Sequence, residues 1–95
     1  MKQYHKTITQ KQNTIIDART EEEFREGHIE NAILIPEYEI AQRAEAELPD
    51  KDALILVYCR SGRRSKIASE GLVKLGYTNV KEFGGIIDWP YETVR

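Results

Sequence analysis

The sequence lacks several features that would assign it to a specialised class of protein. It has a single cysteine among its 95 residues, so an internal disulfide and a zinc site made of cysteines alone are both excluded. His5 and His28 lie far from Cys59 in the sequence and do not have the spacing of metal ligands. We therefore expect no metal. A lone thiol without disulfides favours a reducing, cytoplasmic location.

Long apolar runs and an excess of one charge are also missing. No apolar stretch approaches the ~20 residues of a membrane-spanning helix, and the polar segment 1–12 lacks the apolar core of a secretory signal. The 14 basic and 16 acidic residues give a net charge of -2. The expected partners therefore include neither nucleic acid nor a membrane. No heptad or long amphipathic surface demands a dimer, so a monomer is expected.

The composition that remains is that of an ordinary globular domain. Hydrophobic residues make up 40% and charged residues 32%, without repeats or a linker, which predicts one domain over residues 1–95. Strand-like and helix-like segments alternate, which favours an α/β fold with a mostly parallel sheet. Strands are expected over residues 6–9, 13–18, 32–35, 53–58 and 80–83. Helices are expected after Thr20, over 37–48 and 65–75, and as one turn over 86–89.

The first of these helices has clear boundary signals. Thr20 and Glu23 have the spacing of a capping box, in which each side chain hydrogen-bonds the backbone of the other. Three glutamates in the first turn suit the positive end of the helix dipole. Gly27 is expected to end the helix.

Cys59 follows the most apolar run of the chain, ALILVY over 53–58, which is typical of a central parallel strand. The loop CRSGRR comes next, and a helix is expected to begin near Ser65. Ligands of open α/β sheets bind at the carboxyl ends of strands, and unpaired N–H groups at a helix N-terminus favour an anion. The pattern therefore places Cys59 in an anion-binding loop.

The charges around Cys59 strengthen this interpretation. No acidic residue occurs over 53–69, whereas the loop and helix start are rich in cations: Arg60, Arg63, Arg64 and Lys66. Gly62 allows the backbone to turn its N–H groups inward. A free thiol has a pKa of about 8.5, and helix N-termini and nearby cations lower it to roughly 3.5–7.5. We therefore expect Cys59 to be an activated nucleophile rather than a buried, inert thiol.

Three segments in order resemble the rhodanese family of sulfurtransferases in its single-domain form. They are IIDARTEEEFREGHIENAILIP over 15–36, YCRSGRRS over 58–65 and LGYTNVKEFGGIIDW over 75–89. A departure at Glu30-Asn31, where the family often has Pro-Gly, touches only a turn. The resemblance implies a three-layer α/β/α fold with a central, mostly parallel sheet of about five short strands flanked by helices.

The resemblance also implies a mechanism. The Cys59 thiolate would attack the outer sulfur of an anionic donor such as thiosulfate and become a persulfide, with no other cofactor. An acceptor, either cyanide in an assay or a cellular thiol or protein thiol, would then take the terminal sulfur. The anion-binding loop would consist of Arg60, Ser61, Gly62, Arg63, Arg64 and Ser65. Arg60 and Arg64 would hold the donor, whereas Arg63 either helps or points to solvent.

The remaining matched residues are expected to support the site. Asp17 and Arg19 are predicted to form an ion pair that fixes the strand end. His28 is expected to anchor a turn by hydrogen bonds, and Trp89 to pack in the core.

Alternative functions remain open at this point. Cysteine phosphatases and arsenate reductases have five residues between cysteine and arginine, whereas only four separate Cys59 from Arg64. This spacing disfavours a cradle for a tetrahedral oxyanion. A non-catalytic rhodanese-like binding module is a second alternative. A redox sensor is a third, and it is compatible with sulfur transfer because activated thiols oxidise easily.

Overall fold

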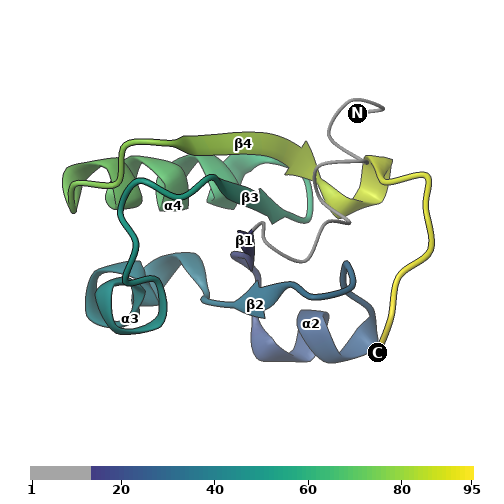
Figure 1. Cartoon of the computed structure of the whole chain (residues 1–95). Coiled ribbons are helices and arrows are strands. Elements are labelled where there is room, and N and C mark those ends of the chain that lie inside the picture. Colours follow the sequence, from purple (N-terminus) through teal and green to yellow (C-terminus); the bar gives the residue numbers. More distant parts are fainter. Residues whose placement is uncertain (1–13) are drawn as a thin grey trace.

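A computed structural model describes residues 14–95, which form a parallel sheet flanked by helices (Figure 1). The strands are β1 (Thr14–Asp17), β2 (Ile33–Leu34), β3 (Ile55–Cys59) and β4 (Val80–Gly85). The helices are α2 (Glu21–Glu26), α3 (Ile40–Glu47) and α4 (Arg63–Lys74), with 3-10 turns η1 (Glu37–Glu39) and η2 (Ile86–Asp88). The predicted α/β class is confirmed. The strand expected over 6–9 lies outside the described residues.

The strand order positions Cys59 in the middle of the sheet edge. The order is β2-β1-β3-β4, and every pairing between these strands is parallel. β3 therefore lies between two neighbours, as its apolar sequence predicts. Asp17 is opposite Tyr58 in the register of β1 and β3, so Cys59 projects beyond the end of β1. The carboxyl ends of both strands meet at one edge.

Both faces of β3 are covered, which explains its uninterrupted apolar sequence. Ile55, Val57 and Cys59 face a core shared with α3 and α4. Leu56 and Tyr58 alternate to the opposite face, where Phe83, Ile86 and Trp89 pack against them. Trp89 thus packs partly buried against the core, as predicted. The alternation follows from the two-residue period of a strand.

The helix boundaries differ slightly from those expected. The predicted capping box is present, since the Glu23 N–H donates to Thr20 Oγ1 at 3.3 Å and the Thr20 N–H donates to Glu23 Oε1 at 3.0 Å. The segment expected to be one helix over 37–48 divides into η1 and α3. α4 begins two residues earlier than predicted, because Gly62 adopts a positive φ of 112° and serves as its N-cap.

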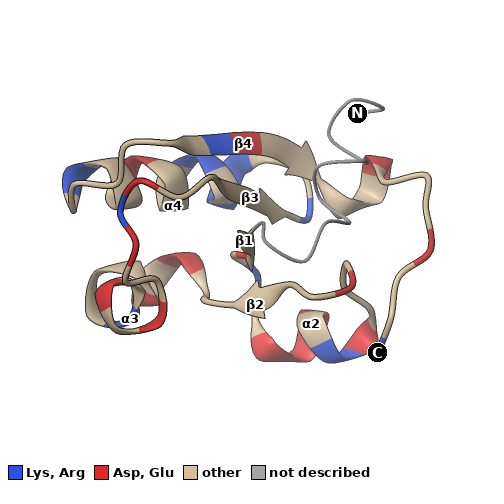
Figure 2. Cartoon of the chain, viewed as in Figure 1, with Lys and Arg blue, Asp and Glu red and all other residues tan. Residues whose placement is uncertain are grey.

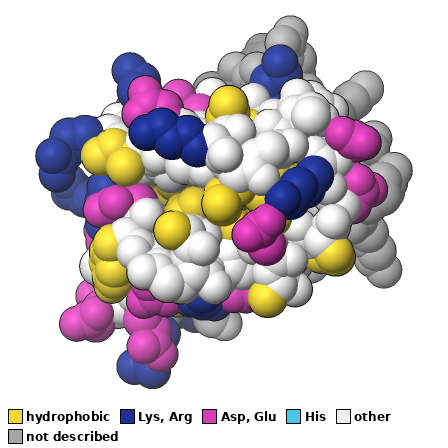
Figure 3. Space-filling view, turned by 90° about the vertical axis from the view of Figure 1, so that its left-hand side faces the viewer, with side chains coloured by type: hydrophobic (Ala, Val, Ile, Leu, Met, Phe, Trp, Pro, Cys, Tyr) yellow, Lys and Arg dark blue, Asp and Glu magenta, His cyan; other side chains and the backbone are white. Residues whose placement is uncertain are grey.

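A hollow with hydrophobic side chains is visible on the side where α3 and the end of α4 lie (Figure 3). A groove of about 350 Å³ between η1, α3 and α4 is lined by Tyr38, Ile40, Ile67 and Leu75, with Glu37, Glu70 and Lys74 at its edges. No helix within residues 14–95 has the length and apolar character needed to cross a bilayer.

Candidate active site

The loop after β3 wraps its backbone around the Cys59 sulfur. The Cys59 side chain is buried, with 1% of its surface exposed. The Gly62 N–H donates to Sγ at 2.9 Å, and Sγ lies 3.5 Å from Ser65 Oγ. A side chain at Gly62 would be strained at its positive φ, so glycine is required where the N–H turns towards sulfur.

The pKa of the Cys59 thiol is set by opposing effects. Burial raises it, but the Ser65 hydroxyl and the backbone N–H groups of Ser65, Gly62 and Ser61 lower it, and the net direction is downward. The predicted direction is confirmed. The predicted cause is only partly right, because hydrogen bonds from the loop, rather than its arginines, are the leading groups that favour the thiolate.

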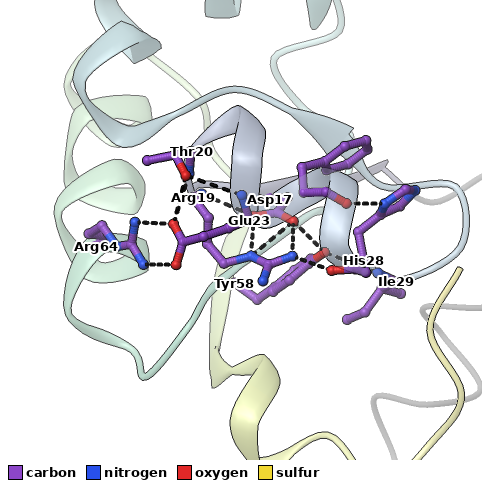
Figure 4. Close-up of polar contacts among 10 residues, drawn as sticks. Asp17, Arg19, Thr20, Glu23, His28, Ile29, Tyr58 and Arg64 are labelled. Atoms are coloured by element: carbon purple, nitrogen blue, oxygen red, sulfur yellow. Dashed lines mark hydrogen bonds and ion pairs between the residues drawn. The ribbon is translucent and has the colours of Figure 1, made fainter. Parts of the chain in front are cut away.

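The Arg64 side chain, which is expected to hold the donor, is paired with a carboxylate of α2. Its guanidinium forms a paired contact with Glu23, with Nη1–Oε1 at 2.7 Å and Nη2–Oε2 at 2.9 Å (Figure 4). Arg64 still interacts electrostatically with Cys59. The segment 53–69 has no acidic residue, but the fold brings a carboxylate to the loop from outside it, because α2 places Glu23 against Arg64.

The other loop residues lie at the surface. Arg60, Ser61 and Arg63 are exposed, and Lys66 is exposed on the first turn of α4. Ser61, Arg63 and Lys66 line a cavity of about 720 Å³ beside the loop, on the side of β4. Arg63 thus faces this open cavity.

Asp17, Arg19 and Tyr58 form a buried polar network behind the loop (Figure 4). Arg19 Nη2 lies 2.8 Å from Asp17 Oδ2, which confirms the predicted ion pair. The Tyr58 hydroxyl donates to the same oxygen at 2.7 Å and accepts from the Ile29 N–H at 3.1 Å. Burial raises the pKa of Tyr58, so it stays protonated. The network joins β1, β3 and the turn after α2.

His28 anchors that turn, as predicted. Its Nδ1 lies 2.8 Å from the Phe24 carbonyl oxygen, and its ring stacks on the Phe24 ring. Its backbone pairs with Val94, which brings the end of the chain beside α2 (Figure 1). Figure 4 shows His28 and Arg64 at opposite ends of the polar network. His28 is thus a structural residue.

Sequence reasoning missed three contributors to this site: Glu23, Tyr58 and Glu82. Glu82 Oε1 lies 2.7 Å from Ser65 Oγ and accepts from the Gly84 N–H at 2.8 Å. The available signal was a glutamate inside a strand-like segment, separated from the glycine pair by Phe83 alone. Among residues 14–95, no cluster of three His, Cys, Asp or Glu side chains is placed to hold a metal ion.

The Glu23–Arg64 pair makes a testable contribution to stability at acid pH. The hydrogen bond from the Arg64 guanidinium is the main cause that lowers the pKa of Glu23 from 4.5 to about 2. The stabilisation is therefore complete above pH 4.5 and is lost as pH falls through 2. We expect Glu23→Gln, which keeps the capping geometry, to lose at most about 3 kcal/mol at pH 7.

Urea unfolding at pH 2–7 measures this difference. Glu21→Gln is the matched control, because Glu21 pairs with Arg25 on the same helix while 63% of its side chain is exposed. An exposed pair contributes roughly 0–1 kcal/mol. Equal losses in the two variants would contradict a special role for Glu23.

Comparison with known proteins agrees with this geometry. Residues 1–90 match the model of the rhodanese-like domain. The thiosulfate sulfurtransferase PspE of Escherichia coli (strain K12) is 41% identical over 73 residues, covering 77% of this chain and 70% of PspE. A sulfurtransferase of Allochromatium vinosum is 41% identical over 76 residues, covering 79% of this chain and 69% of that protein.

A solved structure described as rhodanese with anions from E. coli superposes with a TM-score of 0.81. It shares 37% identity and covers 87% of this chain and 98% of its own. The order of the strands, the loop around Cys59 and these matches lead to one conclusion: the chain belongs to the rhodanese family.

Proposed function

We propose that this protein is a sulfurtransferase that carries a sulfane sulfur on Cys59 as a persulfide. The donor is a small sulfur-bearing anion such as thiosulfate, and the acceptor is a thiol, a protein thiol or cyanide. Relatives named sulfurtransferase and thiosulfate sulfurtransferase support the reaction class. No cofactor beyond the covalent persulfide is needed. The proposal includes a monomer acting in the cytoplasm.

The reaction takes two displacements at sulfur. The Cys59 thiolate attacks the outer sulfur of thiosulfate, a new S–S bond forms, and sulfite leaves with the electrons of the broken bond. The persulfide then holds the negative charge on its outer sulfur. An acceptor thiolate or cyanide attacks that outer sulfur, and the Cys59 thiolate leaves with the electrons of the S–S bond. Charge and electrons balance in both steps.

The observation that carries this proposal is the set of N–H groups that converge on the Cys59 sulfur. The Gly62 N–H contacts Sγ at 2.9 Å, and the backbone N–H groups of Ser61 and Ser65 also favour the thiolate. Such groups stabilise an anion without a general base. They suit a thiolate that regenerates after each transfer. The exposed Arg60 and Arg63 remain available to attract the anionic donor.

Intact mass spectrometry tests the proposal directly. After incubation with thiosulfate and removal of the excess, we expect a gain of one sulfur, about 32 Da, which cyanide or a thiol then removes. Peptide mapping should place the added sulfur on the peptide that contains Cys59. No gain from thiosulfate or from a persulfide donor, with a thiol that still reacts with iodoacetamide, would contradict sulfur transfer. It would direct attention to aryl phosphate and arsenate substrates.

A further inference from the structure

Glu82 introduces a carboxylate into the hydrogen bonding of the Cys59 thiol. It lies on β4, next to a basic residue, Lys81 (Figure 2). Ser65, which is fully buried on the first turn of α4, connects the two side chains. Ser65 Oγ is 2.7 Å from Glu82 Oε1 and 3.5 Å from Cys59 Sγ. The thiol, the hydroxyl and the carboxylate therefore form one chain of hydrogen bonds.

The Ser65 hydroxyl has one proton but several acceptors around it. Besides the carboxylate, the Gly62 carbonyl oxygen lies at 2.9 Å and the Gly84 carbonyl oxygen at 3.4 Å. A charged carboxylate at the shortest distance is the strongest of these acceptors. The Ser65 hydroxyl favours the thiolate only while it donates to Sγ. With its proton directed to Glu82, its oxygen instead presents lone pairs to Cys59 and accepts from the thiol. Lone pairs accept a hydrogen bond from a thiol S–H but repel a thiolate.

We infer that Glu82 is a positioning residue that directs the Ser65 hydroxyl proton away from sulfur and so favours the protonated form of Cys59. Forming the thiolate then requires the hydroxyl to turn from Glu82 to Sγ. The loop N–H groups favour the thiolate, and Glu82 opposes them by reducing the share of Cys59 that is ionised. When the thiolate forms, the S–H bond breaks and its proton passes to water, while the Ser65 hydroxyl keeps its own proton and changes only its hydrogen-bond partner.

Other charged groups surround this chain and must be distinguished from Glu82. On the β4 side, the cavity of about 720 Å³ beside the loop is lined by three charged residues of α4: Arg63, Lys66 and Glu70. On the α2 side, Arg64 interacts with Cys59 and is paired with Glu23. On β1, Asp17 is paired with Arg19. Among these, Glu70 offers the matched comparison, because it adds a carboxylate to the cavity and has no hydrogen bond to Ser65.

The direct test is the pH dependence of the rate at which iodoacetamide alkylates Cys59. Glu82→Gln keeps an oxygen that accepts from the Gly84 N–H but removes the charge that attracts the Ser65 proton. We expect the midpoint of the curve of alkylation rate against pH to fall by about one pH unit, which corresponds to roughly tenfold more thiolate at acid pH. Glu70→Gln should shift it by less than about a third of that. An unchanged or higher midpoint in Glu82→Gln, or equal shifts in both variants, would overturn the inference.

A second variant covers the case in which Glu82→Gln does not fold. Glu82→Asp keeps the charge but shortens the side chain by one methylene, which withdraws the carboxylate from Ser65 Oγ. We expect a smaller fall of the midpoint in the same direction. Circular dichroism confirms folding in each variant. A wild-type midpoint in a folded Glu82→Asp protein would reject the role of the hydrogen bond.

The consequence for sulfur transfer rests on the proposed function. A more basic Cys59 thiolate is a better nucleophile and a poorer leaving group, with a rate that changes by a factor of about three per pKa unit. Glu82 should therefore help the protein retain its persulfide, and Glu82→Gln should release sulfur to a thiol about threefold faster. Alkylation involves no sulfur donor, so a wild-type protein that never gains sulfur rejects the proposed function alone. Unchanged alkylation in Glu82→Gln rejects this inference alone.

Discussion

Cys59→Ser should gain no sulfur from thiosulfate and should lose sulfur transfer by at least about 10⁴-fold, the scale on which removal of a nucleophile acts in enzymes. The chain has one cysteine, so no second thiol can replace it. A serine hydroxyl keeps its proton at neutral pH and does not form a persulfide. We expect the loss to appear in the rate of transfer at every donor concentration.

The structure indicates that this substitution leaves the fold intact. The new hydroxyl would find partners in the Gly62 N–H and Ser65 Oγ, which now contact Sγ. A buried hydroxyl with partners costs far less than one without, so we expect a loss of about 1–2 kcal/mol. Intact mass after thiosulfate and urea unfolding measure the two effects. A Cys59→Ser protein that still gains about 32 Da would place the sulfur on another side chain and contradict the mechanism.

The order of the elements could be predicted from sequence because local signals mark them. The apolar run of β3 predicted its central position, and the Thr20–Glu23 box predicted the start of α2. Each of these signals lies within a few residues of the structure it specifies. The division of residues 37–48 into η1 and α3 was missed, since the apolar spacing of a helix does not distinguish a 3-10 turn from an α-turn.

The site was predictable only where it lies in one segment. Cys59, Gly62 and the start of α4 are neighbours in sequence, and the loop around sulfur was expected. Glu23 and Glu82 come from α2 and β4, and no local pattern shows that they meet Arg64 and Ser65. Counting charges along the chain therefore suggested a purely cationic loop. In the folded protein, Glu23 pairs with one of these cations, Arg64, and Glu82 adds a carboxylate beside Ser65 at the start of α4.

Gly85→Ala is expected to prevent folding or to lower the melting temperature by more than about 15 °C. A Cβ at Gly85 would lie 2.1 Å from the Arg60 carbonyl oxygen and 2.5 Å from Ser61 Cα. These are backbone atoms, so no side-chain rotation relieves the clash. We expect a loss above about 4 kcal/mol, a large share of the 5–15 kcal/mol that usually stabilises a domain. Each kcal/mol corresponds to about 4–8 °C in a chain of this size.

Gly84→Ala is the matched control within the same glycine pair. Nothing lies within 4 Å of a Cβ at Gly84, but its φ of 101° disfavours any side chain. A positive φ costs roughly 1–2 kcal/mol. Thermal unfolding should therefore show a modest shift in Gly84→Ala and a severe one in Gly85→Ala. Similar shifts in the two variants would show that the close approach of β4 to the loop is not rigid.

The same contact links stability to chemistry. Gly85 is opposite Cys59 in the register of β3 and β4, and it lies directly against the Arg60–Ser61 backbone. A folded Gly85→Ala protein can exist only if that backbone moves, and the N–H groups that contact sulfur belong to the same short loop. Its Cys59 should then be alkylated more slowly at neutral pH, while Gly84→Ala keeps the wild-type rate. A normal rate in a folded Gly85→Ala protein would show that the glycine pair supports the sheet without positioning the thiol.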